Sequence, residues 1–388
     1  MASLVELANR VQIAAEDVSS GKTRDNLALL RGIRNLNRVA ESPTDRLRRV
    51  LYQTVQNAVV RLAVEIKLPH SLAAAKEMSA TELALGSEAD RVLVVRLMRV
   101  LVAMDIVDEV GEEQYRSNAT TEALASPTWT GGTRFLHDTL VPSFATLVDY
   151  WHQAGFCPNE GTIFEFAFKQ DFWTWHRERP SAHNDFLVYM RGRKDGSPHW
   201  LDYFPVASQI AHLSPEPDAV TLVDVGGNLG HDVKLFQQRW PDIPGRLVLM
   251  DLPEVVAGNT NVLEGIEKVA YDFFQPQTII GAKFYLFRAI CHDWPDRDCI
   301  TFLRNTVAAM TPGYSHLLIN EQVLPNTGAD LHPALLDITM IAYFRAMERT
   351  ERQWRSLLAA VGDVAIVAIW RLKHAGGGTE AVIDCVRR

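Results

Sequence analysis

The fold is indicated most clearly by one glycine-rich stretch, Leu222-Val223-Asp224-Val225-Gly226-Gly227-Asn228-Leu229-Gly230. Its first residues form a short apolar run typical of a buried strand, and a helical pattern begins near His231. A glycine turn between a strand and a helix lets the backbone approach a ligand closely, and the helix N-terminus can hold a carboxylate or a phosphate. We therefore expect a cofactor site here, with Gly226 and Gly227 among its residues.

An acidic residue beyond the turn indicates which cofactor it is. Twenty-one residues after Gly230, Asp251 ends the next apolar run, where a carboxylate can accept hydrogen bonds from both hydroxyls of a ribose. The spacing Gly-Gly-x-x-Gly differs from the Gly-x-Gly-x-x-Gly of pyrophosphate binders, which favours S-adenosylmethionine over NAD. NAD stays open, as does the simpler interpretation that the glycines only form a tight turn and Asp251 only caps the helix after Leu252-Pro253.

Further short apolar runs alternate with helical segments around this stretch. They are Thr221–Val225, Arg246–Met250, Lys283–Phe287, Ser315–Ile319, Val364–Trp370 and Ala381–Val386. Such alternation predicts an α/β domain with a mostly parallel sheet and helices on both faces. The break Ser214-Pro215-Glu216-Pro217 places the start of this domain near residue 215.

The chain before residue 130 is predicted to be mostly helical. Ser42-Pro43-Thr44-Asp45 can start a helix, and Leu51 to Ile66 predicts one long helix whose apolar stripe meets a partner surface. Ser79-Ala80-Thr81-Glu82 predicts a capped short helix, Ala89–Met104 a second helix and Ile106–Gly111 a small β-wing. Together these elements suggest a winged helix. Such folds often bind DNA, but this chain is acidic and its helix arginines lie among apolar neighbours.

Residues 131–214 form an unusually aromatic helical segment. Its aromatic residues are Phe135, Phe144, Tyr150, Trp151, Phe164, Phe166, Phe168, Phe172, Trp173, Trp175, Phe186 and Tyr189. Such density is typical of plain core packing and also of a ligand pocket, and both interpretations stay open.

Composition excludes several classes of protein. With 388 residues, the chain needs more than one domain, and its net charge of −8 disfavours nucleic acid as a partner. We expect a cytoplasmic protein without a membrane partner, because no apolar run nears the roughly 18 residues of a membrane span and no signal peptide pattern begins the chain. No metal site is expected. Four scattered cysteines predict reduced thiols: Cys157, Cys291, Cys299 and Cys385.

Four more motifs follow the glycine turn in order. Asp272-Phe273 follows the expected third strand, and Phe287–Asp296 follows the fourth. Ile319–Pro325 closes the fifth strand, and Glu348–Trp354 opens a late helix. With these motifs the chain resembles the S-adenosylmethionine-dependent O-methyltransferases of the plant caffeate and fungal secondary-metabolite type. The string His292-Asp293-Trp294-Pro295-Asp296 is the most diagnostic part of the resemblance.

The resemblance covers nearly the whole chain and implies its organisation. It implies a Rossmann-like class I methyltransferase sheet in residues 215–388, preceded by a helical, winged-helix dimerisation domain in residues 1–130. Residues 131–214 would be an aromatic helical linker that lines the substrate pocket. The expected assembly is a homodimer.

The resemblance also implies a role for each matching cofactor residue. Gly226 and Gly227 would contact the methionine part of S-adenosylmethionine, and Asp251 would hold its ribose. The remaining positions expected at the cofactor are Asp224, Leu252, Asp272, Phe273 and Arg288. Arg288 takes the place of the family's basic residue four positions before the histidine.

The same resemblance implies the catalytic residues. His292 would be the general base, Glu321 and Glu348 would hold and polarise it, and Asp293 lies beside it. A phenol or enol is a poor nucleophile until it loses its proton, which a histidine can accept at neutral pH while a carboxylate fixes its tautomer. The substrate would be a hydroxyl-bearing aromatic or polyketide-derived small molecule. The residues expected to contact it are His137, Trp173, Met340 and Phe344.

Three departures from the family pattern affect these expectations. Asn228 replaces the usual third glycine, a position where asparagine tolerates left-handed backbone. The late sequence Ala359–Asp363 replaces the usual Ala-Gly-Phe ending, and the aromatic segment Phe172–His176 matches no single substrate class. The last two departures leave the substrate undetermined.

Two other functions remain. Some fungal relatives of this fold keep the cofactor but catalyse dehydration and pericyclic ring closure, using the sulfonium charge as a fixed electrostatic aid. His292 favours methylation because those relatives replace the histidine by a cationic residue, although His137 and Arg191 could serve the alternative by binding a polar substrate head. The third hypothesis is a non-catalytic dimer partner, which the intact Glu321 and Glu348 disfavour.

Overall fold

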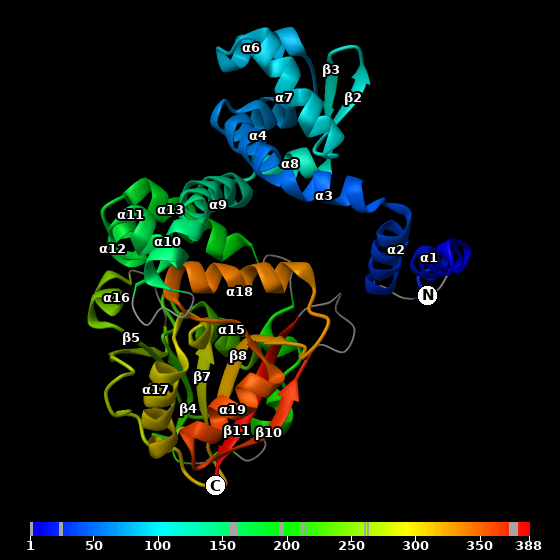
Figure 1. Cartoon of the computed structure of the whole chain (residues 1–388). Helices are drawn as coiled ribbons and strands as arrows, with labels where there is room; N and C mark the ends of the chain where they lie inside the picture. The colour runs from blue at the N-terminus through cyan, green and yellow to red at the C-terminus, as the bar shows by residue number, and fades with distance from the viewer. Residues whose placement is uncertain are drawn as a thin grey trace. The chain divides into compact units, whose positions relative to one another are not determined.

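The computed structural model of the chain describes residues 3–22, 26–155, 161–193, 198–210, 213, 216, 218–259, 261, 264–371 and 379–388. The chain divides into two compact units. The first contains Met1–Lys22 and Ala28–Ser197 and is mostly helical, whereas the second contains Thr23–Leu27 and Pro198–Arg388 and holds a large sheet (Figure 1). The predicted break at 214–217 lies outside the described residues except for Glu216. Within the described ranges, no helix is both long and apolar enough to cross a membrane.

The first unit begins with an arm of separate helices. They are α1 (Leu4–Ser19), α2 (Leu27–Ala40), α3 (Pro43–Leu51) and α4 (Gln53–Glu65). Ser42 caps α3 as its sequence predicts, by accepting a hydrogen bond from the Asp45 N–H at 3.1 Å. The single helix expected from Leu51 to Ile66 is wrong in one respect, because the chain turns at Tyr52 and separates α3 from α4.

A winged helix follows the arm. It contains α5 (Leu68–Ala75), α6 (Ala80–Ser87), α7 (Arg91–Ala103), α8 (Ala119–Ala125) and a three-stranded sheet in the order β1 (Glu77–Ser79), β3 (Gln114–Ser117), β2 (Val107–Gly111). Ser79 and Glu82 form the predicted capping box at the start of α6. Apolar side chains of α7, including Val94 and Leu101, are fully buried in the core of this part.

The aromatic segment forms the rest of the first unit. Its helices are α9 (Pro127–Ala145), α10 (Leu147–Ala154), α11 (Ile163–Phe168), α12 (Phe172–Arg177) and α13 (Pro180–Gly192). Phe135, Phe172 and Phe186 meet through edge-on ring contacts with centroids 5.1 to 6.3 Å apart. Many of the aromatic residues are therefore core, as one of the two interpretations predicted.

The second unit is an α/β sheet. Its strands lie in the order β10 (Val364–Trp370), β11 (Glu380–Arg387), β8 (His316–Leu324), β7 (Phe284–Arg288), β4 (Val220–Val225), β5 (Arg246–Asp251), β6 (Ile266–Ala270), and the short β9 (Arg349–Thr350) pairs with β8. Strands β4 to β8 are parallel, whereas β11 is antiparallel to both of its neighbours. Each predicted apolar run lies mainly in one of these strands. The exception is β6, whose apolar pattern is interrupted by Glu267 and Lys268. Only the position of Asp272-Phe273, which follows the expected third strand, had indicated this strand.

Helices cover both faces of this sheet, as predicted. On one face, α17 (Asp296–Ala309) and α19 (Glu351–Val361) bury Phe302 and Trp354 against the strands. On the other, α15 (His231–Arg239) buries Phe236 together with Trp200 of η1 (Trp200–Asp202). The remaining elements of this unit are α14 (Val206–Ile210), α16 (Pro253–Gly258) and η2 (Cys291–Asp293).

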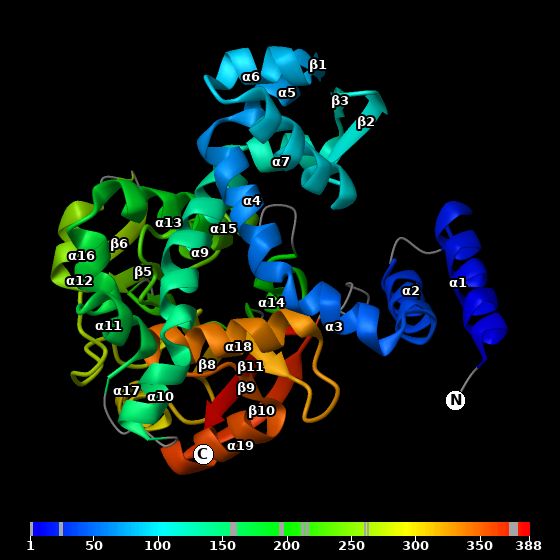
Figure 2. The ribbon, with the colours of Figure 1, turned by 45° about the horizontal axis from the view of Figure 1, so that its top comes forward.

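The order of the strands in the sheet reverses between β4 and β7. In sheets of this kind, ligands bind at such a reversal point, beyond the carboxyl ends of the strands. Helix α18 (Leu331–Phe344) lies across this edge and contacts η2 (Figures 1 and 2). The predicted cofactor and catalytic residues of the second unit therefore follow strands that end at one edge.

Candidate active site

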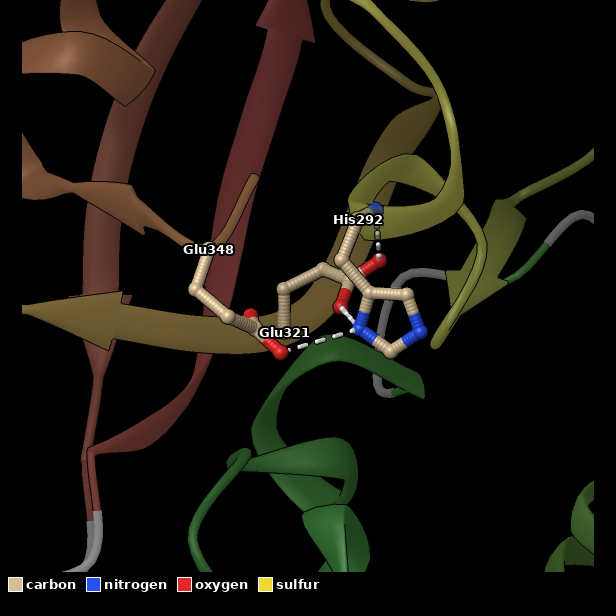
Figure 3. A group of neighbouring side chains, drawn as sticks. All are labelled: His292, Glu321 and Glu348. Carbon is tan, nitrogen blue, oxygen red and sulfur yellow. Dashed lines mark hydrogen bonds and ion pairs between the residues drawn. The ribbon is translucent and has the colours of Figure 1, made fainter. Parts of the chain in front are cut away.

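His292 stands among three carboxylates just beyond β7. Its Nδ1 lies 3.1 Å from Glu321 Oε2 and 3.4 Å from Glu348 Oε1, while Nε2 lies 3.3 Å from Asp293 Oδ1. Figure 3 shows the two glutamates on one side of the ring and Nε2 on the opposite side. The structure therefore brings together all four residues that were predicted to be catalytic.

Glu321 holds the His292 turn as well as the ring. Its Oε1 accepts the backbone N–H of Ile290 at 2.9 Å and that of His292 at 3.3 Å. The Glu321 side chain is 1% exposed, so both of these contacts are buried. Ala289 enters this turn with φ of 54°, a left-handed conformation that costs a non-glycine residue roughly 1–2 kcal/mol. Such strain is typical of functional sites.

Glu348 approaches the ring from a different segment, immediately before β9. Its backbone N–H donates to Asp337 Oδ1 on α18 at 2.9 Å. Its Oε2 is buried and has no hydrogen-bond partner within the part of the chain that the structure describes. Glu348 therefore has one oxygen beside His292 and one buried oxygen whose hydrogen-bonding capacity is not used by the described residues.

The carboxylates favour the charged form of the imidazole. Burial alone lowers the pKa of His292, but Glu321, Asp293 and Glu348 outweigh it and raise that pKa well above 6.5. Burial acts to raise the pKa of Glu321, but the nearby His292 outweighs this effect, and the pKa of Glu321 lies below its usual value. The site thus stabilises the imidazolium that forms when His292 takes a proton.

The same three side chains also have the spacing of a metal cluster. His292, Glu321 and Glu348 each offer one ligand atom, and these atoms lie within 4.8 Å of one another. However, the carboxylate oxygens already face Nδ1, so the negative charges have a partner in the imidazolium. The arrangement is therefore accounted for by proton chemistry.

The glycine turn lies between β4 and α15. Gly226 adopts φ of 70° and donates its N–H to the Met250 carbonyl at 2.8 Å. A Cβ on Gly226 would lie 2.7 Å from Ile290 Cδ1, and a Cβ on Gly227 would lie 2.5 Å from the Asp224 carboxyl. The positive φ of Gly226 and the close approach of side chains to both positions favour glycine at each, which supports the interpretation of a tight turn whatever binds beside it.

Asp251 joins the turn to β5. Its Oδ2 accepts the Asn228 N–H and its Oδ1 the Leu252 N–H, both at 2.8 Å. Since each carboxylate oxygen keeps a free lone pair, Asp251 can still accept hydrogen bonds from two hydroxyls. Asn228 has φ of 52°, so the residue in place of the third glycine adopts the left-handed backbone expected of it.

A buried charge cluster lies behind the turn. Asp224 is 2% exposed, and its Oδ2 has no hydrogen-bond partner among the described residues. Arg288 donates to Asp232 Oδ2 at 2.9 Å and to Asn320 Oδ1 at 3.0 Å. Burial and the nearby Asp232 raise the pKa of Asp224 well above its usual value.

Asp232 and two of its partners, His199 and Trp200, were not predicted from the sequence. Asp232 Oδ1 receives a hydrogen bond from Trp200 Nε1 at 3.0 Å and lies 2.8 Å from His199 Nε2. An acidic residue two positions after the last glycine, in the first turn of a helix, was the available signal. His199 and Trp200 lie more than 30 residues from Asp232 in sequence and gave no such signal, whereas Arg288 was predicted through the family resemblance.

The remaining predicted residues are two expected at the cofactor and four expected at the substrate. Near the glycine turn, the Phe273 ring lies 3.9 Å from the position of a Gly226 Cβ, and Asp272 accepts the Phe274 N–H at 3.0 Å. Met340 and Phe344 lie on α18, the helix that contacts η2. The other two substrate residues, His137 and Trp173, belong to the first unit. Their roles stay predictions.

Two family patterns match the chain. An O-methyltransferase domain matches residues 159–363, and an O-methyltransferase dimerisation domain matches residues 49–127. The first match alone covers more than half of the chain. The chain belongs to the O-methyltransferase family.

Individual relatives span almost the whole O-methyltransferase. Methyltransferase cfoC of Aspergillus candidus is 33% identical over 96% of this chain and 94% of its own length. Demethylsterigmatocystin 6-O-methyltransferase of Aspergillus parasiticus is 31% identical, over 85% of this chain and 86% of its own.

Solved structures resemble the O-methyltransferase over its full length. The structure of LepI in complex with SAM has a TM-score of 0.87 and 29% identity, and covers 100% of both chains. A structure titled "A Pericyclic Reaction enzyme" has a TM-score of 0.86, also with 29% identity and complete coverage. The resemblance to O-methyltransferases inferred from the motifs is confirmed, together with the Rossmann-like fold and its helical N-terminal domain.

Proposed function

We propose that this O-methyltransferase transfers the methyl group of S-adenosylmethionine to a hydroxyl of an aromatic or polyketide-derived small molecule of secondary metabolism, with His292 as general base. The observation that carries the proposal is that Glu321 and Glu348 both lie against Nδ1 of His292, on one side of the ring. Nε2 lies on the other edge of the ring (Figure 3) and is the atom that can take the proton of the hydroxyl.

The chain's own residues supply the proton transfer. Because Glu321 and Glu348 lie nearest Nδ1, their charges favour a proton on that nitrogen, which leaves Nε2 as the acceptor. When His292 takes the proton, both carboxylates stabilise the imidazolium, and Asp293 adds a third negative charge at 3.3 Å. The cofactor supplies the methyl group on a cationic sulfur, and the transfer then depends mainly on in-line placement.

The residues around the glycine turn fit S-adenosylmethionine. The unpartnered Oδ2 of Asp224 is a suitable acceptor for an ammonium group such as that of the methionine part. Asp251 retains acceptor capacity for the two ribose hydroxyls, and Phe273 provides an apolar ring near the turn for adenine. The structure of LepI with SAM supports the same cofactor here.

We also propose a homodimer. The match of residues 49–127 to a dimerisation domain supports it. Along the apolar stripe predicted to meet a partner, Leu51 is 76% and Val55 51% exposed in the single chain. The organisation proposed with it keeps residues 1–130 for dimerisation, 131–214 for the substrate pocket and 215–388 for the cofactor. A cytoplasmic location remains a prediction from the sequence.

His292→Ala tests the proposed base. The variant should lose methylation while it binds S-adenosylhomocysteine with unchanged affinity in isothermal titration calorimetry, because His292 is not among the residues assigned to the cofactor. Glu351→Gln is a suitable control, since Glu351 pairs with Arg355 and Arg371 on the surface of the same unit. Unchanged methylation by His292→Ala would exclude His292 as the base.

A pericyclase or dehydratase is the second candidate, and the similarity to "A Pericyclic Reaction enzyme" favours it. Incubation with methyl-labelled S-adenosylmethionine and a panel of phenolic, enolic and pyridone compounds separates the two. Label in a product, together with S-adenosylhomocysteine, supports methyl transfer. Unconsumed cofactor with a substrate that loses water or changes its ring structure supports the alternative.

A further inference from the structure

Arg349 is a fully buried permanent cation beside the catalytic turn. It lies in β9, directly after Glu348. Its Nη1 donates to the Cys291 carbonyl and its Nη2 to the Trp294 carbonyl, both at 2.8 Å. Its Nε donates to Asp296 Oδ1 at 2.9 Å. A buried charge is tolerated only when its hydrogen bonds are satisfied, so these partners are essential to its placement.

The partners of Arg349 enclose His292 in sequence. Cys291 immediately precedes the histidine, and Trp294 follows two residues after it. Glu321 accepts backbone N–H groups of the same turn, at Ile290 and His292. The turn is therefore held by its N–H groups through Glu321 and by its carbonyls through Arg349.

Arg387, in the same unit, forms hydrogen bonds similar to those of Arg349 but far from His292, and so serves as a structural comparison. Arg387 donates through Nη1 to the carbonyls of Ala308 and Met310, both at 3.0 Å, and through Nε to Asp363 at 2.9 Å. Its neighbour Val386 pairs with the first residue of β8, whereas Glu321 lies five residues further along that strand. Arg387 thus makes similar bonds near the opposite end of the strands from His292.

We propose that Arg349 is a positioning residue for His292, which holds the imidazole at its distance from Glu321 and Glu348 through the carbonyls of Cys291 and Trp294. The proposal rests on the proposed role of His292 as base. Because Glu348 and Arg349 are consecutive, one segment supplies both a carboxylate for the ring and the anchor for its turn. A catalytic group misplaced by about 1 Å costs roughly 10²-fold in rate.

Arg349→Lys tests the proposal because lysine keeps the charge but lacks the planar fork that reaches both carbonyls. In the full-length protein with ¹³C-labelled histidine, NMR should show the pKa of His292 moving from its raised value toward 6.5, as the ring leaves the carboxylates. His292→Gln assigns the resonance. Methylation should fall by at least about 30-fold, since 1 Å of misplacement costs roughly 10²-fold, while S-adenosylhomocysteine affinity changes less than about threefold.

Arg387→Lys is the matched control and should leave the pKa of His292 and the methylation rate unchanged. If Arg349→Lys loses thermal stability but matches Arg387→Lys in both measurements, Arg349 serves folding alone and the proposal is wrong. Should Arg349→Lys not fold, Asp296→Asn replaces it, because the Asp296 side chain is 54% exposed. A shift of the pKa of His292 in the same direction is then expected, and no shift overturns the proposal.

The pKa of His292 is measured by NMR without any methylation reaction. The positioning role of Arg349 and the base role of His292 can therefore be disproved independently. A shifted pKa in Arg349→Lys combined with full methylation by His292→Ala would remove the base role and keep the positioning role. An unshifted pKa combined with inactive His292→Ala would do the reverse.

Discussion

Glu321 contacts His292 with both carboxylate oxygens: Oε1 accepts the backbone N–H at 3.3 Å, and Oε2 lies 3.1 Å from the ring nitrogen Nδ1. One side chain therefore fixes the backbone and the ring of the same residue. Glu348 reaches only the ring, at 3.4 Å, and its own anchor is a backbone bond to Asp337. The two glutamates are consequently unequal partners of the proposed base.

We expect Glu321→Gln to reduce methylation more than Glu348→Gln does. Glutamine at 321 removes the charge nearest Nδ1 and can present an amide N–H to it, which disfavours the tautomer with Nε2 free. Errors of this kind cost about 10²- to 10⁴-fold in rate. Glu348→Gln should cost about tenfold less, because the longer contact and the remaining Glu321 preserve the ring orientation. Initial rates with labelled cofactor measure both variants, and an equal loss would contradict the inequality.

The pH dependence of methylation should follow His292. Burial opposes the charge, but the three carboxylates raise the pKa of His292 well above 6.5, so the ring is protonated and unable to act as a base at lower pH. The rate should therefore rise with pH, with a midpoint above 6.5. In Glu321→Gln that midpoint should move down toward 6.5. A rate profile that is flat between pH 6 and 9 would contradict this assignment.

Stability should depend on pH through the same residue, with the opposite trend. A histidine whose pKa is higher in the folded chain than in the unfolded one binds its proton more tightly when folded. Its contribution is fully present below about pH 6.5 and is lost as pH rises through the folded pKa of His292. Urea unfolding at pH 6 and pH 9, compared between the natural chain and His292→Gln, isolates this contribution. An identical pH dependence in both proteins would show that His292 makes none.

The sequence predicts those parts of the site that are coded locally. The apolar run before Gly226 and the acid at Asp251 indicate a strand, a turn and the next strand without any knowledge of distant contacts. The string from His292 to Asp296 indicates the base through family resemblance. By contrast, β6 was hidden because Glu267 and Lys268 break its apolar run.

Contacts between distant segments could not be predicted in the same way. Arg349 meets Cys291 across 58 residues, and Arg288 meets Asp232 across 56. Nothing in the local pattern of either arginine names its partner, because the pairing arises only when strands such as β4, β7 and β8 are aligned in the sheet. Sequence reasoning thus assigned Arg288 to the cofactor without detecting the carboxylate that holds it.

The left-handed backbone of Asn228 leads to a prediction about stability. At φ of 52°, Asn228→Ala should reduce the free energy of unfolding by about 1 kcal/mol, because alanine resists left-handed backbone. Asn228→Gly should stay within about 0.5 kcal/mol of the natural chain. Since the Asn228 N–H donates to Asp251, the alanine variant should also bind S-adenosylhomocysteine more weakly. Urea unfolding and calorimetry check the two effects, and equal behaviour of the two variants would contradict the role of backbone strain.

Asp224→Asn should affect stability and binding in opposite directions. The Asp224 Oδ2 is buried without a partner in the described chain, and burial raises the pKa of Asp224 and so disfavours its charged form. Replacing the carboxyl group by an amide of the same shape should therefore leave the cofactor-free protein at least as stable. If that oxygen meets the cofactor's ammonium group, the affinity for S-adenosylhomocysteine should fall about 10- to 100-fold, as expected for a hydrogen bond between charged groups.

Asp384→Asn is the matched control for this prediction. Asp384 is also completely buried, but it has partners, with His316 Nδ1 at 2.7 Å and Trp370 Nε1 at 3.4 Å. Its replacement should lower the melting temperature and leave the affinity for S-adenosylhomocysteine unchanged. Melting curves without ligand and calorimetric titrations of both variants complete the comparison. If Asp224→Asn instead destabilises the protein and binds normally, Asp224 is a structural residue and the ammonium site must lie elsewhere.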